Sequence, residues 1–139
     1  MTPITTTAEL AAFCNQLKGQ PFVAVDTEFM RETTYWPKLC LIQAAAPSAE
    51  AVIDPLAGGL DLEPFLEILR DPSIEKVFHA ARQDVEIFNN LSAMPQSLFD
   101  TQVAGMAAGF GEQIGYDPLV PQMLKIGLVG CGGRGPGAA

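Results

Sequence analysis

The chain has 139 residues, 48% of them hydrophobic, which is the size and apolar content of one ordinary globular domain. Its formal net charge is −8, and this argues against a surface that attracts polyanions by itself, because neutralising phosphates requires clustered lysines and arginines. No segment reaches the roughly 18 apolar residues of a membrane helix and the N-terminus lacks a signal-peptide pattern, so we expect a soluble, cytoplasmic protein.

The first half of the chain predicts one helix followed by three strands. Residues 7–18 place apolar side chains at helical spacing behind a threonine that can act as the N-cap. Residues 21–27 are predicted as a strand, and residues 38–46 as a second strand, apolar on both faces and therefore central in a sheet. The segment "AEAVIDP" predicts a short third strand that Pro55 ends.

In the second half, helices alternate with a strand. Residues 61–70 predict a helix with Asp61 as its cap, Pro64 in its first turn and an apolar stripe along one face. The other expected elements are a strand at "EKVFHA", a helix from about Ala81 to Leu91, a helix with Asp100 as N-cap, and a helix beginning near "YDPLVPQMLK".

This order of elements predicts an α/β domain built around a mixed sheet flanked by helices. From Gly127 the chain reads "GLVGCGGRGPGAA", which lacks periodicity, so we expect residues 127–139 to be a disordered tail behind a domain of residues 1–126. The three cysteines, Cys14, Cys40 and Cys131, lack metal-type spacing and are expected to be reduced thiols.

The segment "PFVAVDTEFM" sets two carboxylates at the end of a predicted strand. Because strand side chains alternate, Asp26 and Glu28 share one face, about 7 Å apart at Cα, and Thr27 lies on the other. Like charges this close raise each other's pKa or attract a cation. The alternative is that the strand has already ended and both acids point into water.

A third acid, Asp84, lies within the apolar arc of the helix predicted over "HAARQDVEIFNNL", whereas Glu86 points outward. A carboxylate on a packing face costs several kcal/mol unless it is paired, hydrogen-bonded or metal-bound. Its partner could be a metal ion, a neighbouring backbone amide or Arg82.

Three acids form a set of hard oxygen ligands, which suits Mg²⁺ or Mn²⁺ better than zinc. Only His79 is available as a softer ligand, and no cysteine is near it in sequence. Ions held by carboxylates a few Å apart are the apparatus of two-metal phosphodiester hydrolysis, and they would supply the positive charge that the whole chain lacks.

Five blocks, spread in order over residues 6–126, resemble the ribonuclease D family of the DEDD 3′–5′ exonuclease superfamily, which has a ribonuclease H-like fold. They are "FVAVDTEF", "YWPKLCLIQ", "AVIDPL", "VFHAARQDVEIF" and "LFDTQVAG".

The resemblance implies roles for individual residues. Asp26, Glu28 and Asp84 correspond to the first two exonuclease motifs, and are expected to be the catalytic metal ligands of a two-metal Mg²⁺ or Mn²⁺ site. The residues expected to contact the terminal nucleotide or line the site are Thr27, Phe29, Met30, His79 and Gln83. For His79 a place at the core edge is an equal alternative, Gln43 is expected to pack within its strand, and Asp100 is interpreted as a helix cap.

One part of the family pattern is missing. The third motif, a Tyr or His followed by the fourth metal-binding Asp, belongs downstream of Ile126, and "GYDPL" has neither its spacing nor its location. We therefore expect a domain whose C-terminal part is missing, with a weakened metal site. We expect an exposed apolar face to follow, and with it either self-association or marginal stability.

The resemblance implies a metal-dependent exoribonuclease that releases nucleoside 5′-monophosphates from RNA 3′ ends, with precursor-tRNA-like or other structured RNA as partner. Because of the missing motif, this chain could be inactive. The competing hypothesis is a non-catalytic RNA-binding or interaction module derived from the same fold.

Overall fold

The computed structural model describes residues 1–31 and 35–115. The chain divides into two compact units, Met1–Phe99 and a second that begins at Asp100, and each is described by itself. The helix expected near "YDPLVPQMLK", the boundary expected at Ile126, the expected tail and Cys131 all lie outside the described residues.

The elements follow the chain in the order that the sequence predicts, with one addition. They are α1 (Thr7–Leu17), β1 (Phe22–Met30), β2 (Lys38–Ala46), β3 (Ala49–Ile53), α2 (Glu63–Arg70), β4 (Glu75–Phe78), α3 (Arg82–Asn90), β5 (Leu98–Asp100) and α4 (Thr101–Ala107). The addition is β5, a three-residue strand that is too short to leave a period-two signal in the sequence.

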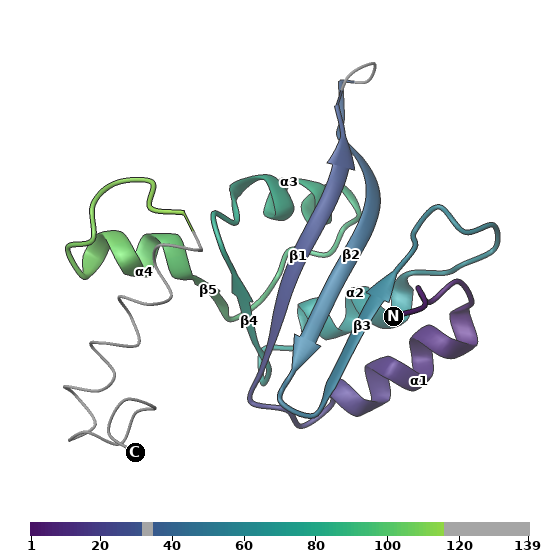
Figure 1. Ribbon diagram of the computed structural model, residues 1–139. Helices are drawn as coiled ribbons and strands as arrows, with labels where there is room; N and C mark the ends of the chain where they lie inside the picture. Colours follow the sequence, from purple (N-terminus) through teal and green to yellow (C-terminus); the bar gives the residue numbers. More distant parts are fainter. Residues whose placement is uncertain (32–34, 116–139) are drawn as a thin grey trace. The chain divides into compact units, whose positions relative to one another are not determined.

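The strands form one mixed sheet in the order β3-β2-β1-β4-β5, which confirms the α/β prediction (Figure 1). β1 pairs antiparallel with β2 and parallel with β4, so it lies near the middle of the sheet. Its register with β2 shifts between Glu28 and Phe29, which marks a bulge directly after the second acid.

The helices α1, α2 and α3 supply one layer over the sheet and enclose the core (Figure 1). Alternate residues of β1, namely Val23, Val25 and Thr27, are buried on this face. The fully buried side chains are mainly aliphatic and aromatic. Among the described residues the exception is Lys76 of β4, whose Nζ donates hydrogen bonds to the carbonyl oxygens of Asp71 and Ile74.

The helix caps partly confirm the prediction. The Thr6 hydroxyl accepts a hydrogen bond from the Glu9 amide while the Glu9 carboxylate accepts from the Thr6 amide, which completes a capping box for α1. The expectation that Asp61 is the N-cap of α2 was wrong, because the cap is Leu62. The Asp61 carboxylate nevertheless accepts a hydrogen bond of 2.9 Å from the Glu63 amide.

The second unit confirms the cap predicted at Asp100. Its carboxylate accepts hydrogen bonds from the amides of Gln102 and Val103, at 2.8 and 3.4 Å, and starts α4.

Cys14 is buried and Cys40 is half-buried, and both are free thiols, as expected. Over residues 1–31 and 35–115, no helix is long and apolar enough to cross a membrane.

Candidate active site

The two acids of β1 lie on the face opposite the helical layer, as the alternation predicts. Asp26 and Glu28 are exposed, whereas Val25 before them and Thr27 between them are buried. The strand therefore continues through both acids to Met30, and the alternative in which it ends before them was wrong. The two carboxylates stand on a paired strand near the middle of the sheet.

Asp84 reaches β1 from the first turn of α3. It is 7% exposed, and its Oδ1 accepts a hydrogen bond of 2.5 Å from the hydroxyl of Thr27, which is also 7% exposed. The sequence pattern indicated that Asp84 needs a partner, but it did not indicate this one. The bond fixes the carboxylate of the helix against the strand that carries Asp26 and Glu28.

The electrostatic environment of Asp84 is unfavourable for a negative charge. Burial is the largest effect and raises the pKa of this carboxyl. The hydrogen bond from Thr27 lowers the pKa and partly offsets burial, and the charge of Asp26 raises the pKa further. Asp26 and Asp84 are therefore close enough to repel each other. A bound cation would relieve this repulsion, and such perturbed carboxyls are typical of functional sites.

The donor set is chemically suited to a hard divalent ion, since it consists of carboxylate oxygens. Among the residues that the structure describes, however, no group of three His, Cys, Asp or Glu side chains is arranged to hold a metal ion. The structure thus couples Asp26 with Asp84 and places Glu28 on the face of Asp26, without bringing all three together.

The other predicted site residues differ in how far they are exposed. Phe29 is half-buried and packs against the core, while Met30, at the end of β1, is 54% exposed. His79 is half-buried in the turn between β4 and α3, and Gln83 is exposed in the first turn of α3. The Thr27 side chain points to Asp84. Only the backbone of Thr27 could therefore contact a ligand that lies on the face of Asp26.

The turn that leads into α3 contains a residue with a strained backbone conformation. Ala80, between β4 and α3, has φ of 56°, in the left-handed region that non-glycine residues rarely adopt. Such strain persists where the surrounding structure fixes it, and it is frequent at active sites.

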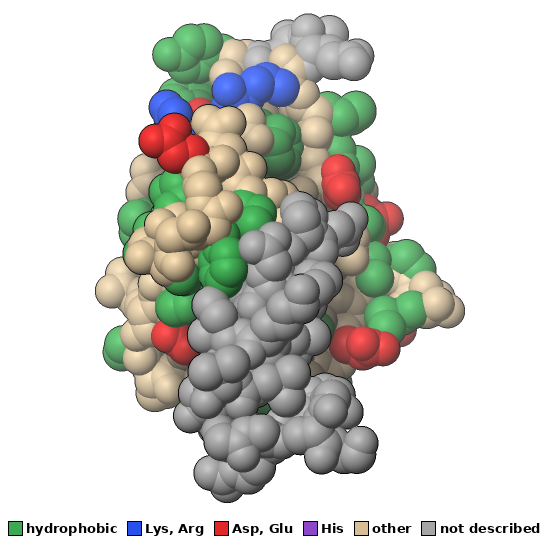
Figure 2. All heavy atoms as spheres, turned by 60° about the vertical axis from the view of Figure 1, so that its left-hand side comes forward, with side chains coloured by type: hydrophobic (Ala, Val, Ile, Leu, Met, Phe, Trp, Pro, Cys, Tyr) green, Lys and Arg blue, Asp and Glu red, His purple; other side chains and the backbone are tan. Residues whose placement is uncertain are grey.

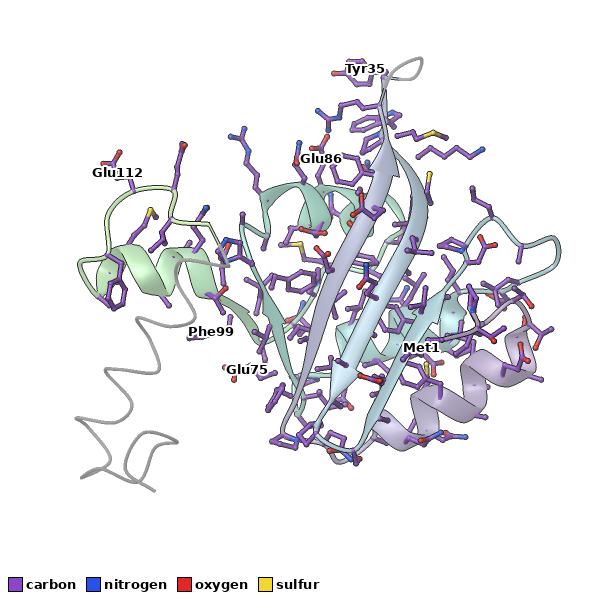
Figure 3. The ribbon with its side chains drawn as sticks, viewed as in Figure 1. Met1, Tyr35, Glu75, Glu86, Phe99 and Glu112 are labelled. Carbon is purple, nitrogen blue, oxygen red and sulfur yellow. The ribbon has the colours of Figure 1, made fainter. Side chains whose placement is uncertain are left out.

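Two residues near the acids were not expected at the site. Gln43 is the register partner of Asp26 and is exposed rather than packed, which the alternation along β2 could have indicated. Arg31, just after β1, forms an ion pair of 2.9 Å with Glu86 of α3, so the hairpin is joined to the helix that carries Asp84. Figure 3 shows Glu86 on α3.

Comparisons with known proteins identify the family of this chain. A family described as 3′-5′ exonuclease matches residues 1–129. Ribonuclease D of Granulibacter bethesdensis is 55% identical over 123 residues, and that of Jannaschia sp. is 54% identical over 130. These matches cover 88% and 90% of this chain.

Among solved structures, Escherichia coli RNase D superposes with a TM-score of 0.81 at 40% identity, covering 88% of this chain and 33% of that one. The chain spans about a third of the length of these curated relatives, 31% and 34%. Because the family match extends over most of its residues, the chain belongs to the 3′–5′ exonuclease family, as a homologue of ribonuclease D.

Proposed function

We propose that this chain carries the exonuclease domain of a ribonuclease D and hydrolyses RNA from the 3′ end to nucleoside 5′-monophosphates. The observation that carries the proposal is the hydrogen bond of 2.5 Å by which Thr27 holds the buried Asp84 of α3 against the strand that carries Asp26 and Glu28. Carboxylates of one sign that a strand and a helix bring into one region form a site that gains from a divalent ion.

The ion proposed is Mg²⁺ or Mn²⁺, held by Asp26, Glu28 and Asp84. When bound, such ions activate the attacking water and stabilise the leaving oxygen. Thr27 is a positioning residue, because its hydroxyl fixes one oxygen of Asp84.

The terminal nucleotide is proposed to lie beside Asp26 and Glu28. Met30 offers an exposed apolar side chain two residues beyond Glu28, and Gln83 offers an exposed amide one residue before Asp84. Phe29, His79 and the Thr27 backbone would line the same region. The Escherichia coli relative is described as acting in structured RNA processing, and we propose structured RNA as the substrate class here too.

A second candidate function is RNA binding without hydrolysis, by a module derived from this fold. The observation that favours it is that the described residues do not bring three metal ligands together. Such a module would hold RNA whether or not its acids are intact.

A 3′-end degradation assay with 5′-labelled RNA and Mn²⁺ distinguishes the two. An exonuclease should shorten the RNA stepwise, and EDTA should stop the reaction. The Asp26→Asn variant should be inactive. Glu75→Gln is a matched control, since it also neutralises an exposed strand acid. Metal-independent RNA binding that survives Asp26→Asn, without degradation by the unchanged chain, would favour the binding module.

A further inference from the structure

Gln43 of β2 lies directly across from Asp26, on the sheet face opposite the helical layer. The register pairs Gln43 with Asp26 of β1 on one side and with Val52 of β3 on the other. Residues directly opposite each other on antiparallel strands project to one face, with Cβ atoms about 4.5–5.5 Å apart. Asp26 and Gln43 are both exposed, and each stands between two buried residues of its strand. The carboxamide of Gln43 therefore shares the face of the two acids of β1.

The positions around Gln43 on this face are apolar or acidic. Leu41 and Ala45 precede and follow Gln43 on the same face of β2, and they pair with Glu28 and Glu50. These two glutamates are thus the diagonal neighbours of Gln43, within reach of a long side chain. No lysine or arginine occupies the described strand positions that adjoin Gln43 on this face. In the view of Figure 2, too, lysine and arginine side chains gather at the top, whereas acidic ones are spread along both sides.

The hydrogen-bonding groups of the Gln43 side chain are not used by the fold. Within the part of the chain that the structure describes, this side chain forms no hydrogen bond. The side chains of Gln20 and Gln102, in contrast, donate hydrogen bonds to the Ser48 hydroxyl and to the carbonyl oxygen of Ile114. A glutamine amide offers two N–H donors and one carbonyl acceptor. Those of Gln43 can therefore contact a ligand that lies beside Asp26.

The charges around Gln43 favour a neutral ligand group over an anionic one. A phosphate oxygen beside Gln43 would face the carboxylates of Asp26 and Glu28, which repel it unless a metal ion lies between them. A ribose hydroxyl is neutral, and it both donates and accepts hydrogen bonds, as the carboxamide does. The ribose of the terminal nucleotide is also bonded directly to the reacting phosphate group, whereas the base lies beyond the ribose. The terminal ribose is therefore the group that best fits this position.

We propose that Gln43 is a specificity-determining residue that hydrogen-bonds the 2′-hydroxyl of the terminal ribose and thereby favours RNA over DNA. This inference rests on the proposed function, because that function brings the 3′ end of the substrate to Asp26 and Glu28. The 2′-hydroxyl is the group by which a protein distinguishes RNA from DNA at a given nucleotide. Gln43 is exposed, so the discrimination should be that of one hydrogen bond, about tenfold or less.

Two 5′-labelled octaadenylates that differ only in the sugar of the last nucleotide test this contact. One ends in adenosine and the other in 2′-deoxyadenosine. With Mn²⁺ and subsaturating substrate, the unchanged chain should remove the last nucleotide of the first about tenfold faster than that of the second. Gln43→Met keeps the length of the side chain and removes the amide. It should slow the removal of the terminal ribonucleotide about tenfold and leave the removal of the deoxynucleotide unchanged.

The ratio between the two substrates separates this role from a structural one. A variant that only disturbed β2 would lose activity on both substrates equally, whereas a lost contact to the 2′-hydroxyl affects one of them. Gln16→Met is the matched control, because it replaces an exposed glutamine of α1, in the helical layer, and should keep the full preference for the terminal ribonucleotide. The same preference in Gln43→Met as in the unchanged chain would overturn the proposal.

Binding measurements separate this inference from the proposed function. Fluorescence anisotropy with Ca²⁺ in place of Mn²⁺, on oligonucleotides checked on a gel for integrity, gives dissociation constants for both substrates. If no RNA is cleaved in Mn²⁺ while binding shows the preference and Gln43→Met abolishes it, the contact stands and the proposed hydrolysis fails. If RNA is cleaved and Gln43→Met keeps the preference, the hydrolysis stands and the contact fails. Equal affinity of the unchanged chain for both oligonucleotides, or no measurable binding, would also overturn the contact.

Discussion

The hydroxyl of Thr27 donates a hydrogen bond of 2.5 Å to the carboxylate of Asp84, which lies 57 positions later in the chain. Both side chains are buried, so this bond joins the central strand to α3 inside the protein. It also sets the orientation of one of the acids proposed to bind metal.

Replacing Thr27 by valine should keep the shape of the side chain and leave the buried Asp84 oxygen without this donor. We expect the free energy of unfolding to fall by about 1–3 kcal/mol, the usual cost of an unsatisfied buried polar group. Urea denaturation at pH 7 measures this change. Thr27→Ser is the control that keeps the hydroxyl, and equal losses for both variants would contradict the assigned role of the bond.

Replacing Asp84 by asparagine should separate stability from activity. The amide oxygen can still accept from Thr27, while the change removes a charge that burial and Asp26 disfavour. We expect the melting temperature to stay the same or to rise by up to about 5 °C. RNA hydrolysis should fall by a factor of about 10² or more.

Thermal melting and the Mn²⁺ degradation assay on the same preparation check both parts. A variant that is clearly less stable and still active would show that Asp84 serves the fold rather than the reaction. Asp26→Asn should lose activity as well, without loss of stability.

Burial of Cys14 should make the protein sensitive to alkali. Burial raises the pKa of this thiol from 9.0 to about 12. The unfolded chain therefore loses its proton first, so the stabilisation is complete below pH 9 and is lost as the pH rises towards 12. The expected slope of unfolding free energy is about 1.4 kcal/mol per pH unit.

Urea denaturation at pH 8, 9, 10 and 11 measures this slope, and Cys14→Ala should flatten it. The half-buried Cys40 provides the control, since Cys40→Ala also removes a thiol. If Cys14→Ala kept the full slope, another group would be responsible for it.

The capping box of α1 offers a local prediction. Thr6→Ala removes the hydroxyl that accepts from the Glu9 amide, and it should destabilise the protein by about 1 kcal/mol. The hydrogen bond from the Thr6 side chain is also the largest cause of the lowered pKa of Glu9, so that pKa should rise in the variant.

An NMR pH titration of the Glu9 carboxyl, together with thermal melting, checks both effects. Thr6→Ser should behave as the unchanged chain because it retains the hydroxyl. A pKa of Glu9 that is unchanged in Thr6→Ala would show that the backbone amides hold the carboxylate instead.

The sequence by itself determined the features that depend on near neighbours. The alternation along β1 placed Asp26 and Glu28 on one face, and the helical period placed Asp84 on a packing face. A threonine cap for the first helix and Asp100 as a cap were recognisable, because a cap contacts amides only two or three residues away. The order of strands and helices was enough to predict a mixed sheet.

The tertiary structure alone decided which distant residues meet. The bond between Thr27 and Asp84, and the ion pair between Arg31 and Glu86, join positions more than fifty residues apart, and no local period encodes such a contact. The parallel pairing of β1 with β4 brings α3 to the end of the strand that carries the acids. Sequence patterns identified the acids of the site, and chain topology set their distances and their burial.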